Sequence, residues 1–309
     1  MSVLSSIRQR IAKPVKRFTR KARLARSLSP FLPVVTCVDV GASYYPHVKW
    51  ALFLQSPQTR WLAVEPNEAN IGYVEAWPYP SQVSKCTTGL SSKGGRQTLY
   101  VTNVDSGSSL LEPVIPASMA RRMRNLDYFF PLRKQDIDTL TLADVLAGSP
   151  ADAPVFVKLD TQGTELSILS GARALLESHR IVGIELEATL QAQPVMQGAG
   201  KFWEACQYLE NLGFELLHVK PIYGPSRFGI NPPRGLTFLN ECDSVFAVRQ
   251  DVAAGLSVEC RIGLLAFYLS YQLFEEALCV LQEDAPVKAF LAARGCSVEP
   301  LAALIRGMA

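Results

Sequence analysis

The sequence predicts an open α/β fold in which a mostly parallel sheet is covered by helices on both faces. Short β-rich runs alternate with helical stretches between residues 34 and 249, as expected for parallel strands joined by helical crossovers. The run VKLDTQGTELSILSGA at 157–172 shows one such unit: an apolar strand, a polar break with a glycine, and an apolar helix. The 309 residues suffice for one large domain and an appendage.

Hydrophobic periodicity and turn residues place the individual elements. The expected strands span residues 34–40, 60–65, 82–87, 155–160, 181–187, 214–220 and 244–249. The expected helices span residues 46–55, 67–76, 141–146, 165–176 and 201–212. A further strand is expected at 97–101. The stretch 102–135 is long, with a Ser-Gly-Ser-Ser run and three prolines, which indicates a lid or substrate loop.

Both ends of the chain differ from this body. Before Asp39 there are nine basic residues and no acidic one, whereas the rest of the chain carries a net charge of −6. Apolar residues recur there at spacings of three and four, which predicts a basic amphipathic helix that Pro14 kinks or splits. Such a segment is typical of a membrane or polyanion contact, a solvated arm, or a mitochondrial presequence. After residue 250, two or three short helices are expected, for instance over 260–282.

These shifts divide the chain into a basic arm at 1–33, an α/β domain at 34–250 and a helical appendage at 251–309. The sequence shows no run of eighteen apolar residues and no secretory signal, so we expect a cytoplasmic protein. The arm would allow peripheral contact with the inner face of a membrane. The seven cysteines form no CxxC pair, which indicates reduced thiols rather than disulfides or a zinc site.

Polar residues cluster where the first two expected strands end. In CVDVGASYYPH the chain turns at Asp39, Gly41 and Ala42, which we expect to expose backbone N–H groups to a ligand. The GxGxxG series that approaches a pyrophosphate is absent, which disfavours NAD. Glu65 ends the next strand, where a carboxylate accepts both hydroxyls of a ribose or caps the following helix. Asp39 and Glu65 suit a ligand with a ribose, an ammonium and a sulfonium, such as S-adenosylmethionine.

The segment 157–172 supplies a candidate catalytic carboxylate. Lys158 and Asp160 alternate onto one face of the strand, so Asp160 lies at its tip, where it would face a bound substrate. Gly163 permits the turn that follows. Glu165 suits the first turn of the next helix, because an acidic side chain is favoured at the positive end of the helix dipole.

These segments resemble the FkbM-type methyltransferases. The similarity is carried, in chain order, by VDVGA, VEPN, GSSL, IDTLTLADVL, VKLDTQGTELSILSGA, GIELE, LGFEL and DSVFAVR, and it covers residues 34–249. It implies a class I fold, with a seven-stranded sheet whose last strand is antiparallel. It also implies O-methylation with S-adenosylmethionine as the cofactor, frequently of sugars or polyketide-like metabolites. The domain at 34–250 is therefore expected to be a methyltransferase domain.

The resemblance also implies a set of cofactor contacts. The methionine moiety would contact Asp39, Gly41 and Ala42, and the ribose would contact Glu65. The adenine would lie between Thr88, Gly89 and Leu90. The sequence departs from the family pattern in GASYYPH, where a further glycine is usual.

Methyl transfer to a hydroxyl requires alignment of donor and acceptor and removal of the acceptor's proton. The candidate bases are, in order, Asp160, Glu187 at the tip of the fifth strand, and His218 on the sixth. Alternatively, Lys158 and Glu185 form a buried ion pair that holds the strands in register, and His218 is structural. No metal site is predicted, although the carboxylates leave a magnesium ion open as an alternative.

The sequence thus predicts an S-adenosylmethionine-dependent O-methyltransferase acting on a sugar, polysaccharide, glycolipid or related secondary metabolite. The alternatives are a nucleotide-dependent oxidoreductase on a Rossmann-like fold and a non-catalytic scaffold with a degenerate cofactor site. Expected partners are a hydroxylated acceptor, an anionic membrane contacted through residues 1–30, and a second copy bound through the C-terminal helices. Nucleic acid is not expected, because the body is acidic and Phe18 is the single aromatic residue among the basic ones of the arm.

Overall fold

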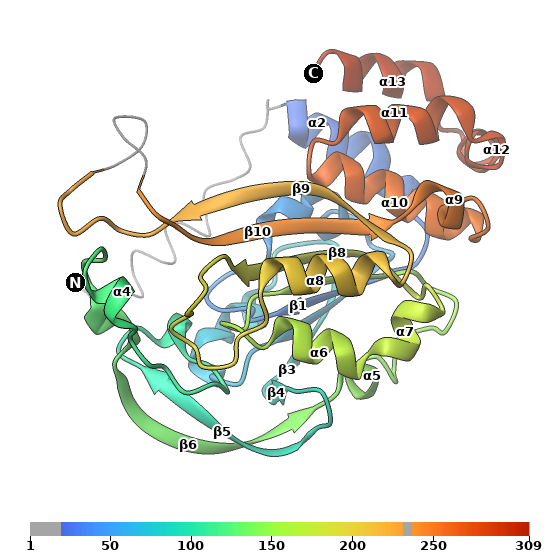
Figure 1. The fold of residues 1–309 in the computed structure, drawn as a ribbon. Helices are drawn as coiled ribbons and strands as arrows, with labels where there is room; N and C mark the ends of the chain where they lie inside the picture. The colour runs from blue at the N-terminus through green and yellow to red at the C-terminus, as the bar shows by residue number, and fades with distance from the viewer. Residues whose placement is uncertain (1–19, 231–236, 309) are drawn as a thin grey trace.

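The computed structural model describes residues 20–230 and 237–308, and its centre is a seven-stranded sheet in the order β3-β2-β1-β7-β8-β10-β9 (Figure 1). The strands are β1 (Val35–Val40), β2 (Thr59–Val64), β3 (Gln82–Cys86), β7 (Val155–Leu159), β8 (Ile181–Thr189), β9 (Phe214–Tyr223) and β10 (Leu239–Val248). β10 is antiparallel to both of its neighbours, and the remaining pairs are parallel. The predicted mostly parallel sheet with an antiparallel last strand is confirmed.

The central strands are apolar because both faces of the sheet are covered. Every residue of β1 is buried, and β7 is buried except at Lys158. The covering helices in the middle of the chain are α3 (Ala51–Leu54), α5 (Leu142–Val145), α6 (Glu165–Gly171), α7 (Arg173–Glu177) and α8 (Phe202–Glu210). α6, α7 and α8 lie under one face of the sheet (Figure 1).

Three predicted helices are shorter or more broken than expected. The segment 46–55 is a turn of 3-10 helix, η2 (Val48–Trp50), followed by α3. The segment 67–76 consists of two 3-10 turns, η3 (Glu68–Asn70) and η4 (Gly72–Ala76). The helix expected at 165–176 breaks between α6 and α7 at Ala172. Close packing surrounds this break, since a Cβ on Gly171 would lie 2.2 Å from the Ser92 carbonyl oxygen.

A second, three-stranded sheet lies beside the main one and contains the predicted extra strand. Its order is β4-β6-β5, with β4 (Gly89–Leu90), β5 (Gly95–Thr102) and β6 (Pro131–Leu140). The predicted loop at 102–135 therefore includes the start of β6, and it also holds η5 (Asp105–Gly107), α4 (Ala117–Ala120) and η6 (Leu126–Phe129). A small separate hydrophobic cluster, which includes Met119, Met123 and Phe129, packs this region.

The C-terminal helices are α9 (Gln250–Ala253), α10 (Val258–Ser270), α11 (Phe274–Glu283), α12 (Ala285–Ala293) and α13 (Val298–Arg306). The expected helix at 260–282 is two helices, because the chain turns at Gln272, which has a positive φ of 63°. One hydrophobic core runs from the sheet into these helices. They therefore pack on the α/β body.

Part of the predicted N-terminal arm belongs to this core as well. Residues 1–19 lie outside the described residues, but α2 (Arg20–Leu28) contacts α3 and α13. Leu24, Ala25 and Leu28 are buried there. Within 20–230 and 237–308, no helix has the length and apolar character that crossing a bilayer requires. All seven cysteines are free.

Candidate active site

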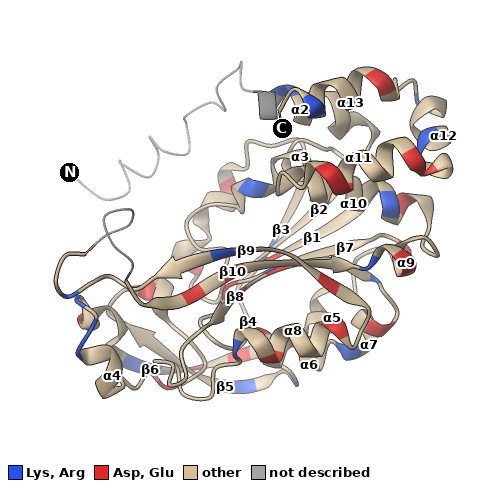
Figure 2. Ribbon diagram, turned by 45° about the horizontal axis from the view of Figure 1, so that its top comes forward, with Lys and Arg blue, Asp and Glu red and all other residues tan. Residues whose placement is uncertain are grey.

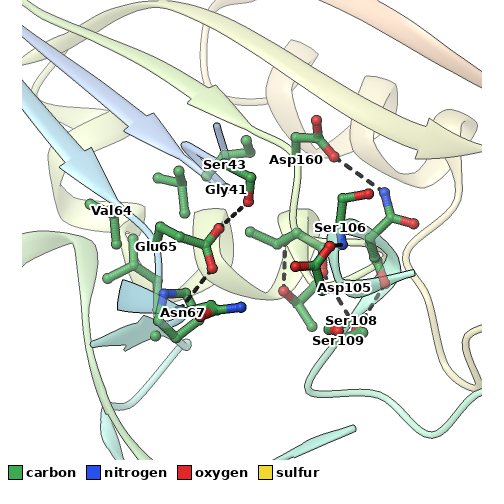
Figure 3. Close-up of a pocket in the computed structure, with 18 of the residues that line it drawn as sticks. Gly41, Ser43, Val64, Glu65, Asn67, Asp105, Ser106, Ser108, Ser109 and Asp160 are labelled. Carbon is green, nitrogen blue, oxygen red and sulfur yellow. Dashed lines mark hydrogen bonds between the residues drawn. The ribbon is translucent and has the colours of Figure 1, made fainter. Parts of the chain in front are cut away.

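A cavity of about 760 Å³ opens at the carboxyl ends of β1, β2, β7 and β8 (Figure 3). This is the point at which the sheet order reverses, since β1 pairs with β2 on one side and with β7 on the other. Open α/β sheets bind ligands in the crevice at such a point. The volume lies within the range usual for small-molecule sites.

Gly41 makes the tight turn that brings β1 against β7. Its φ is +75°, and a Cβ there would lie 2.0 Å from the Asp160 carbonyl oxygen, so no other residue fits. The backbone N–H groups of Gly41 and Ala42 donate to the Val64 carbonyl at 2.9 and 3.1 Å. The prediction that this turn offers those N–H groups to a ligand is therefore wrong, because β2 uses them. Gly41 supplies close packing of strands instead.

Glu65, directly after β2, lines the cavity with a carboxylate that is 7% exposed. Its Oε1 accepts the Asn67 N–H at 2.9 Å, and its Oε2 accepts the Ser43 hydroxyl (Figure 3). Burial raises the pKa of this carboxyl, and the two hydrogen bonds offset part of the increase. The following 3-10 turn has its own cap, the Asn67 side chain, which accepts the Ala69 N–H. Glu65 is thus oriented toward the cavity rather than needed as a helix cap.

The structure places five of the seven expected cofactor residues in the cavity wall. These are Asp39, Gly41, Glu65, Gly89 and Leu90, whereas Ala42 and Thr88 are not part of the lining. Ala42 is buried in the core, and the Thr88 hydroxyl contacts Cys86 Sγ at 3.0 Å. The implied contacts of these two side chains are therefore not supported by the geometry. Beside Gly89 and Leu90, the apolar side chains of Leu99, Val101 and Ile137 from the β5–β6 hairpin complete an apolar slot.

Lys158 holds Asp160 and Asp39 at the floor of the cavity. Its Nζ lies 3.2 Å from Asp160 Oδ2 and 3.7 Å from Asp39 Oδ1. It also donates to the carbonyls of Val40 and Gly41, both at 3.3 Å. The alternative in which Lys158 forms an ion pair with Glu185 is therefore wrong. Although partial desolvation in the cavity opposes ionisation, the Lys158 charge holds the pKa of Asp160 below its usual value, so Asp160 is ionised at neutral pH.

Glu187 faces Asp160 across a bridging amide and has the opposite protonation tendency. Gln162 Nε2 donates to Asp160 Oδ1 at 3.2 Å and to Glu187 Oε2 at 2.8 Å. Burial first, and then the Asp160 charge, raises the pKa of Glu187 well above its usual value. Two neighbouring carboxylates with pKa values pushed apart are suited to different roles in proton transfer. Asp160 can accept a proton, whereas Glu187 retains its own.

His218, the third candidate base, is not brought to this site. It lies on the edge strand β9, opposite Val245 of β10, its side chain is exposed, and it does not line the cavity. A base must come within hydrogen-bond reach of the proton that it removes. The prediction of a catalytic role for His218 is therefore not supported by its position.

A charged network that sequence analysis missed lies over β8 and β10. Glu185 is 4% exposed and accepts hydrogen bonds from Lys49 Nζ and from the Tyr271 hydroxyl. His47 Nε2 lies 2.6 Å from Glu185 Oε2, and Lys49 Nζ lies 3.4 Å from Asp243 Oδ2. Burial would raise the pKa of Glu185, but His47 and Lys49 outweigh it and hold the pKa at about 2. The cavity is lined by four members of this network, His47, Lys49, Glu185 and Asp243, but not by Tyr271.

The predicted substrate loop supplies the wall opposite the sheet. Asp105 accepts a hydrogen bond from the Tyr44 hydroxyl, so the loop after β1 meets the loop after β5. Ser109 Oγ donates to the Gln162 carbonyl at 2.9 Å. Ser109 belongs to the GSSL motif that carried part of the family resemblance, and this was the signal that could have placed it here. Tyr128 also lines the cavity.

The strand order, the antiparallel β10 and a ligand cavity at the ends of β1 and β2 define a class I methyltransferase fold. A family model described as the methyltransferase FkbM domain matches residues 39–216. Since this match spans more than half of the chain, the protein belongs to the FkbM methyltransferase family. The predicted resemblance is confirmed. The match ends before β10 and the C-terminal helices.

Comparison with solved structures returns methyltransferases at low similarity. One is precorrin-6y C5,15-methyltransferase from Geobacter metallireducens, at 14% identity over 77% of this chain and 94% of that chain, with a TM-score of 0.31. Another is an S-adenosylmethionine-dependent O-methyltransferase from Thermotoga maritima, at 10% identity over 81% and 72%, with a TM-score of 0.35. A comparison with curated proteins found no significant match. The assignment therefore depends on the family match and on the sheet topology.

The lining residues fit S-adenosylmethionine. Glu65 presents a buried carboxylate at the position suited to a ribose, and the slot beside Leu90 is apolar, as a purine ring requires. Among the described residues, eight carboxylates and three lysine or arginine side chains line the cavity, an excess that favours a cationic sulfonium. No group of His, Cys, Asp and Glu within the described part of the chain is arranged to hold a metal ion.

Proposed function

We propose that this methyltransferase transfers the methyl group of S-adenosylmethionine to a hydroxyl of a sugar, in a polysaccharide, a glycolipid or a related metabolite. The observation that carries the proposal is the shared cavity, which has Glu65 at one end and the ionised Asp160 beside Glu187 at the other. The family match supports methyl transfer. The hydroxyl acceptor is argued from the side chains alone.

The end of the cavity over β1 and β2 would bind the cofactor, whose sulfonium supplies the methyl group. Glu65 would accept the ribose hydroxyls through the lone pairs that Ser43 and Asn67 leave open. Gly89 and Leu90 would contact the adenine. Asp39, buried and held by the His47 backbone N–H at 2.9 Å, adds negative charge near the methionine moiety.

The other end of the cavity would bind and activate the acceptor. Glu187, Gln162 and Lys49 offer the donors and acceptors that a polyhydroxylated ligand requires. Asp160 would accept the hydroxyl proton as the methyl group is transferred, because Lys158 keeps its carboxylate ionised. Its side chain is 41% exposed, so the proton can pass on to solvent. The enzyme would otherwise act by holding donor and acceptor in line.

Two measurements test this proposal separately. Calorimetric titration should show binding of S-adenosylmethionine and no binding of NAD, and the reverse result would overturn the cofactor assignment. Incubation with methyl-labelled S-adenosylmethionine and a cell-envelope glycan extract should label a glycan in an alkali-stable linkage. Label in protein or in base-labile esters, with none in ether linkage, would contradict the sugar hydroxyl as acceptor.

The predicted partners and location remain proposals. We propose a cytoplasmic enzyme whose basic arm contacts the inner face of an anionic membrane, and residues 1–19 of that arm lie outside the described residues. Association through the C-terminal helices also stays a prediction. No large apolar side chain of α10 to α13 is exposed, so such an interface would be polar.

A further inference from the structure

Two segments far apart in the sequence lie side by side at one end of the molecule and carry arginines. The chain after α4 pairs with the start of the β9–β10 connection: the Arg124 N–H donates to the Pro225 carbonyl at 3.0 Å, and the Arg227 N–H donates to the Arg122 carbonyl at 2.8 Å. The pairing places Arg122 opposite Arg227. Figure 2 shows basic residues along this region, at the left around α4. We call Arg121, Arg122, Arg124 and Arg227 the arginine surface.

The positive charge of the arginine surface is not neutralised within the described part of the chain. Arg122 contacts Gln191 and stacks over the Phe238 ring, 4.7 Å from its centroid. The side chains of the other three arginines make no ion pair or hydrogen bond with a described residue. Like charges opposite each other in paired strands destabilise the pair. Four arginines without an acidic partner, on an acidic body, therefore suggest an anionic partner outside this chain.

Exposed apolar side chains follow directly on the same connection. Phe228 is 78% exposed and Ile230 is 45% exposed, and Arg227 adjoins them. A large aromatic and a branched aliphatic side chain in water are unfavourable unless something covers them. Arginine guanidinium groups bind lipid phosphates, and apolar side chains enter the acyl boundary beneath. A soluble polyanion would use the arginines and leave Phe228 and Ile230 in water.

The arginine surface is joined by packing to the wall of the active-site cavity. Met123, which lies between Arg122 and Arg124, is 6% exposed and belongs to the small hydrophobic cluster with Phe129. Tyr128 packs against that cluster and also lines the cavity. A bilayer bound at the arginine surface would therefore lie beside the side of the cavity that holds Glu187 and Gln162.

We propose that the arginine surface, with Phe228 and Ile230 as inserted side chains, docks the enzyme on an anionic bilayer beside its acceptor site. This surface is formed by other segments of the sequence than the N-terminal arm, and its use does not depend on which acceptor is methylated. Guanidinium groups would bind the lipid phosphates while the two apolar side chains cross the headgroup layer.

Insertion of the arginine surface into a bilayer can be measured in the full chain with a tryptophan placed at position 228 as a fluorescent reporter. In the Phe228→Trp variant, vesicles of phosphatidylcholine and phosphatidylglycerol should shift the added tryptophan emission to the blue, and brominated phosphatidylcholine should quench it. The natural Trp203 on α8, 49% exposed, is the internal control, and the emission of the unsubstituted protein should change little. If the protein sediments with the vesicles but the tryptophan at position 228 is not quenched, the proposal is overturned and the membrane binding belongs to the N-terminal arm.

The charge requirement is tested by the variant Arg121→Ala/Arg124→Ala/Arg227→Ala. In the Phe228→Trp background it should need at least about ten-fold more anionic lipid for half-maximal quenching, since each arginine near the surface contributes favourably. The matched control is Lys93→Ala/Arg96→Ala/Arg306→Ala, which removes three exposed charges elsewhere and should change this value by less than about two-fold. Equal effects of the two triple variants would contradict a specific surface. If the arginine variant lost its binding to dextran sulfate but its tryptophan were still quenched as before, the partner of the arginines would be a soluble polyanion instead.

Discussion

The two ends of the active-site cavity are built in different ways. The end over β1 and β2 is formed by short sequence motifs at strand ends, where Gly41 sets the turn and Glu65 is oriented by Asn67 and Ser43, which are 2 and 22 residues away. The end over β7, β8 and β10 is formed by charged side chains from distant parts of the sequence. Glu185 there is held by Lys49 and by Tyr271, which are 136 and 86 residues away.

This difference suggests that the two ends have different tolerance to substitution. At the first end a residue acts largely alone, so its removal should affect one property, the affinity for the cofactor. At the second end the charges depend on one another, because Lys158 sets the protonation of Asp160 and Asp160 raises the pKa of Glu187. Changes there should therefore affect turnover, stability and pH dependence together.

The largest effect is expected at Asp160. Asp160→Asn should reduce turnover by roughly 10²–10⁴-fold, the usual range for loss of a general base, and leave the calorimetric affinity for S-adenosylmethionine within a few-fold. The control is Glu187→Gln, which imitates the protonated form that the structure favours and should retain activity within about ten-fold at neutral pH. If Glu187→Gln were the inactive variant, the two carboxylates would have exchanged roles.

Next in size is the effect of Glu65 on cofactor binding. Glu65→Ala should weaken S-adenosylmethionine binding by about 1.5–3 kcal/mol, because hydrogen bonds to a charged group are lost. Glu75→Ala is a matched control, since the Glu75 side chain is 71% exposed and, among the described residues, forms an ion pair with Lys85 alone. Unchanged affinity in a folded Glu65→Ala protein would remove Glu65 from the ribose site and would break the contrast between the two ends.

Tyr271 tests whether the C-terminal helices support the second end. Its hydroxyl accepts from Trp50 Nε1 at 2.7 Å and donates to Glu185. Tyr271→Phe should lower the free energy of unfolding by about 1–3 kcal/mol, because buried polar groups lose a partner. Tyr268→Phe should change it by less than about 0.5 kcal/mol, since the Tyr268 hydroxyl has no hydrogen bond to a described residue. Similar urea midpoints for the two variants would refute the bond from Tyr271 to Glu185.

The smallest effect concerns pH. Burial, with the charges of Glu165 and Asp160, raises the pKa of Glu241 to about 7. A carboxyl with a raised folded-state pKa contributes stability that is complete below its unfolded pKa and is lost as the pH rises through the folded value. The protein should therefore lose on the order of 1 kcal/mol between about pH 6 and pH 8. Glu241→Gln should reduce the pH dependence of the free energy of unfolding, measured by thermal unfolding at several pH values. An unchanged pH dependence would indicate that Glu187 causes it instead.

The local pattern of the sequence determined the strands of the main sheet and the two carboxylates that directly follow a strand, Glu65 and Asp160. Buried parallel strands are continuous apolar runs, and polar residues that interrupt such a run after its last apolar position have only the crevice to face. Glu65 and Asp160 could be placed on this basis, whereas Asp39 lies within β1, one residue before its end. The helix lengths were less well determined, as at 67–76, because short segments form 3-10 turns or α-helix according to what packs on them.

Tertiary structure alone decided which of these groups act together. His218 and Glu187 are both candidate bases on the sequence pattern, but only Glu187 lines the cavity, because β8 is a central strand whereas His218 lies in the middle of the edge strand β9. The raised pKa of Glu187 depends on burial and on the charge of Asp160, which comes from a different strand, and no local pattern encodes this contact. Tyr271 reaches Glu185 only because the C-terminal helices share one core with the sheet. Contacts between residues so far apart in the chain arise from packing, and packing exists only in the folded protein.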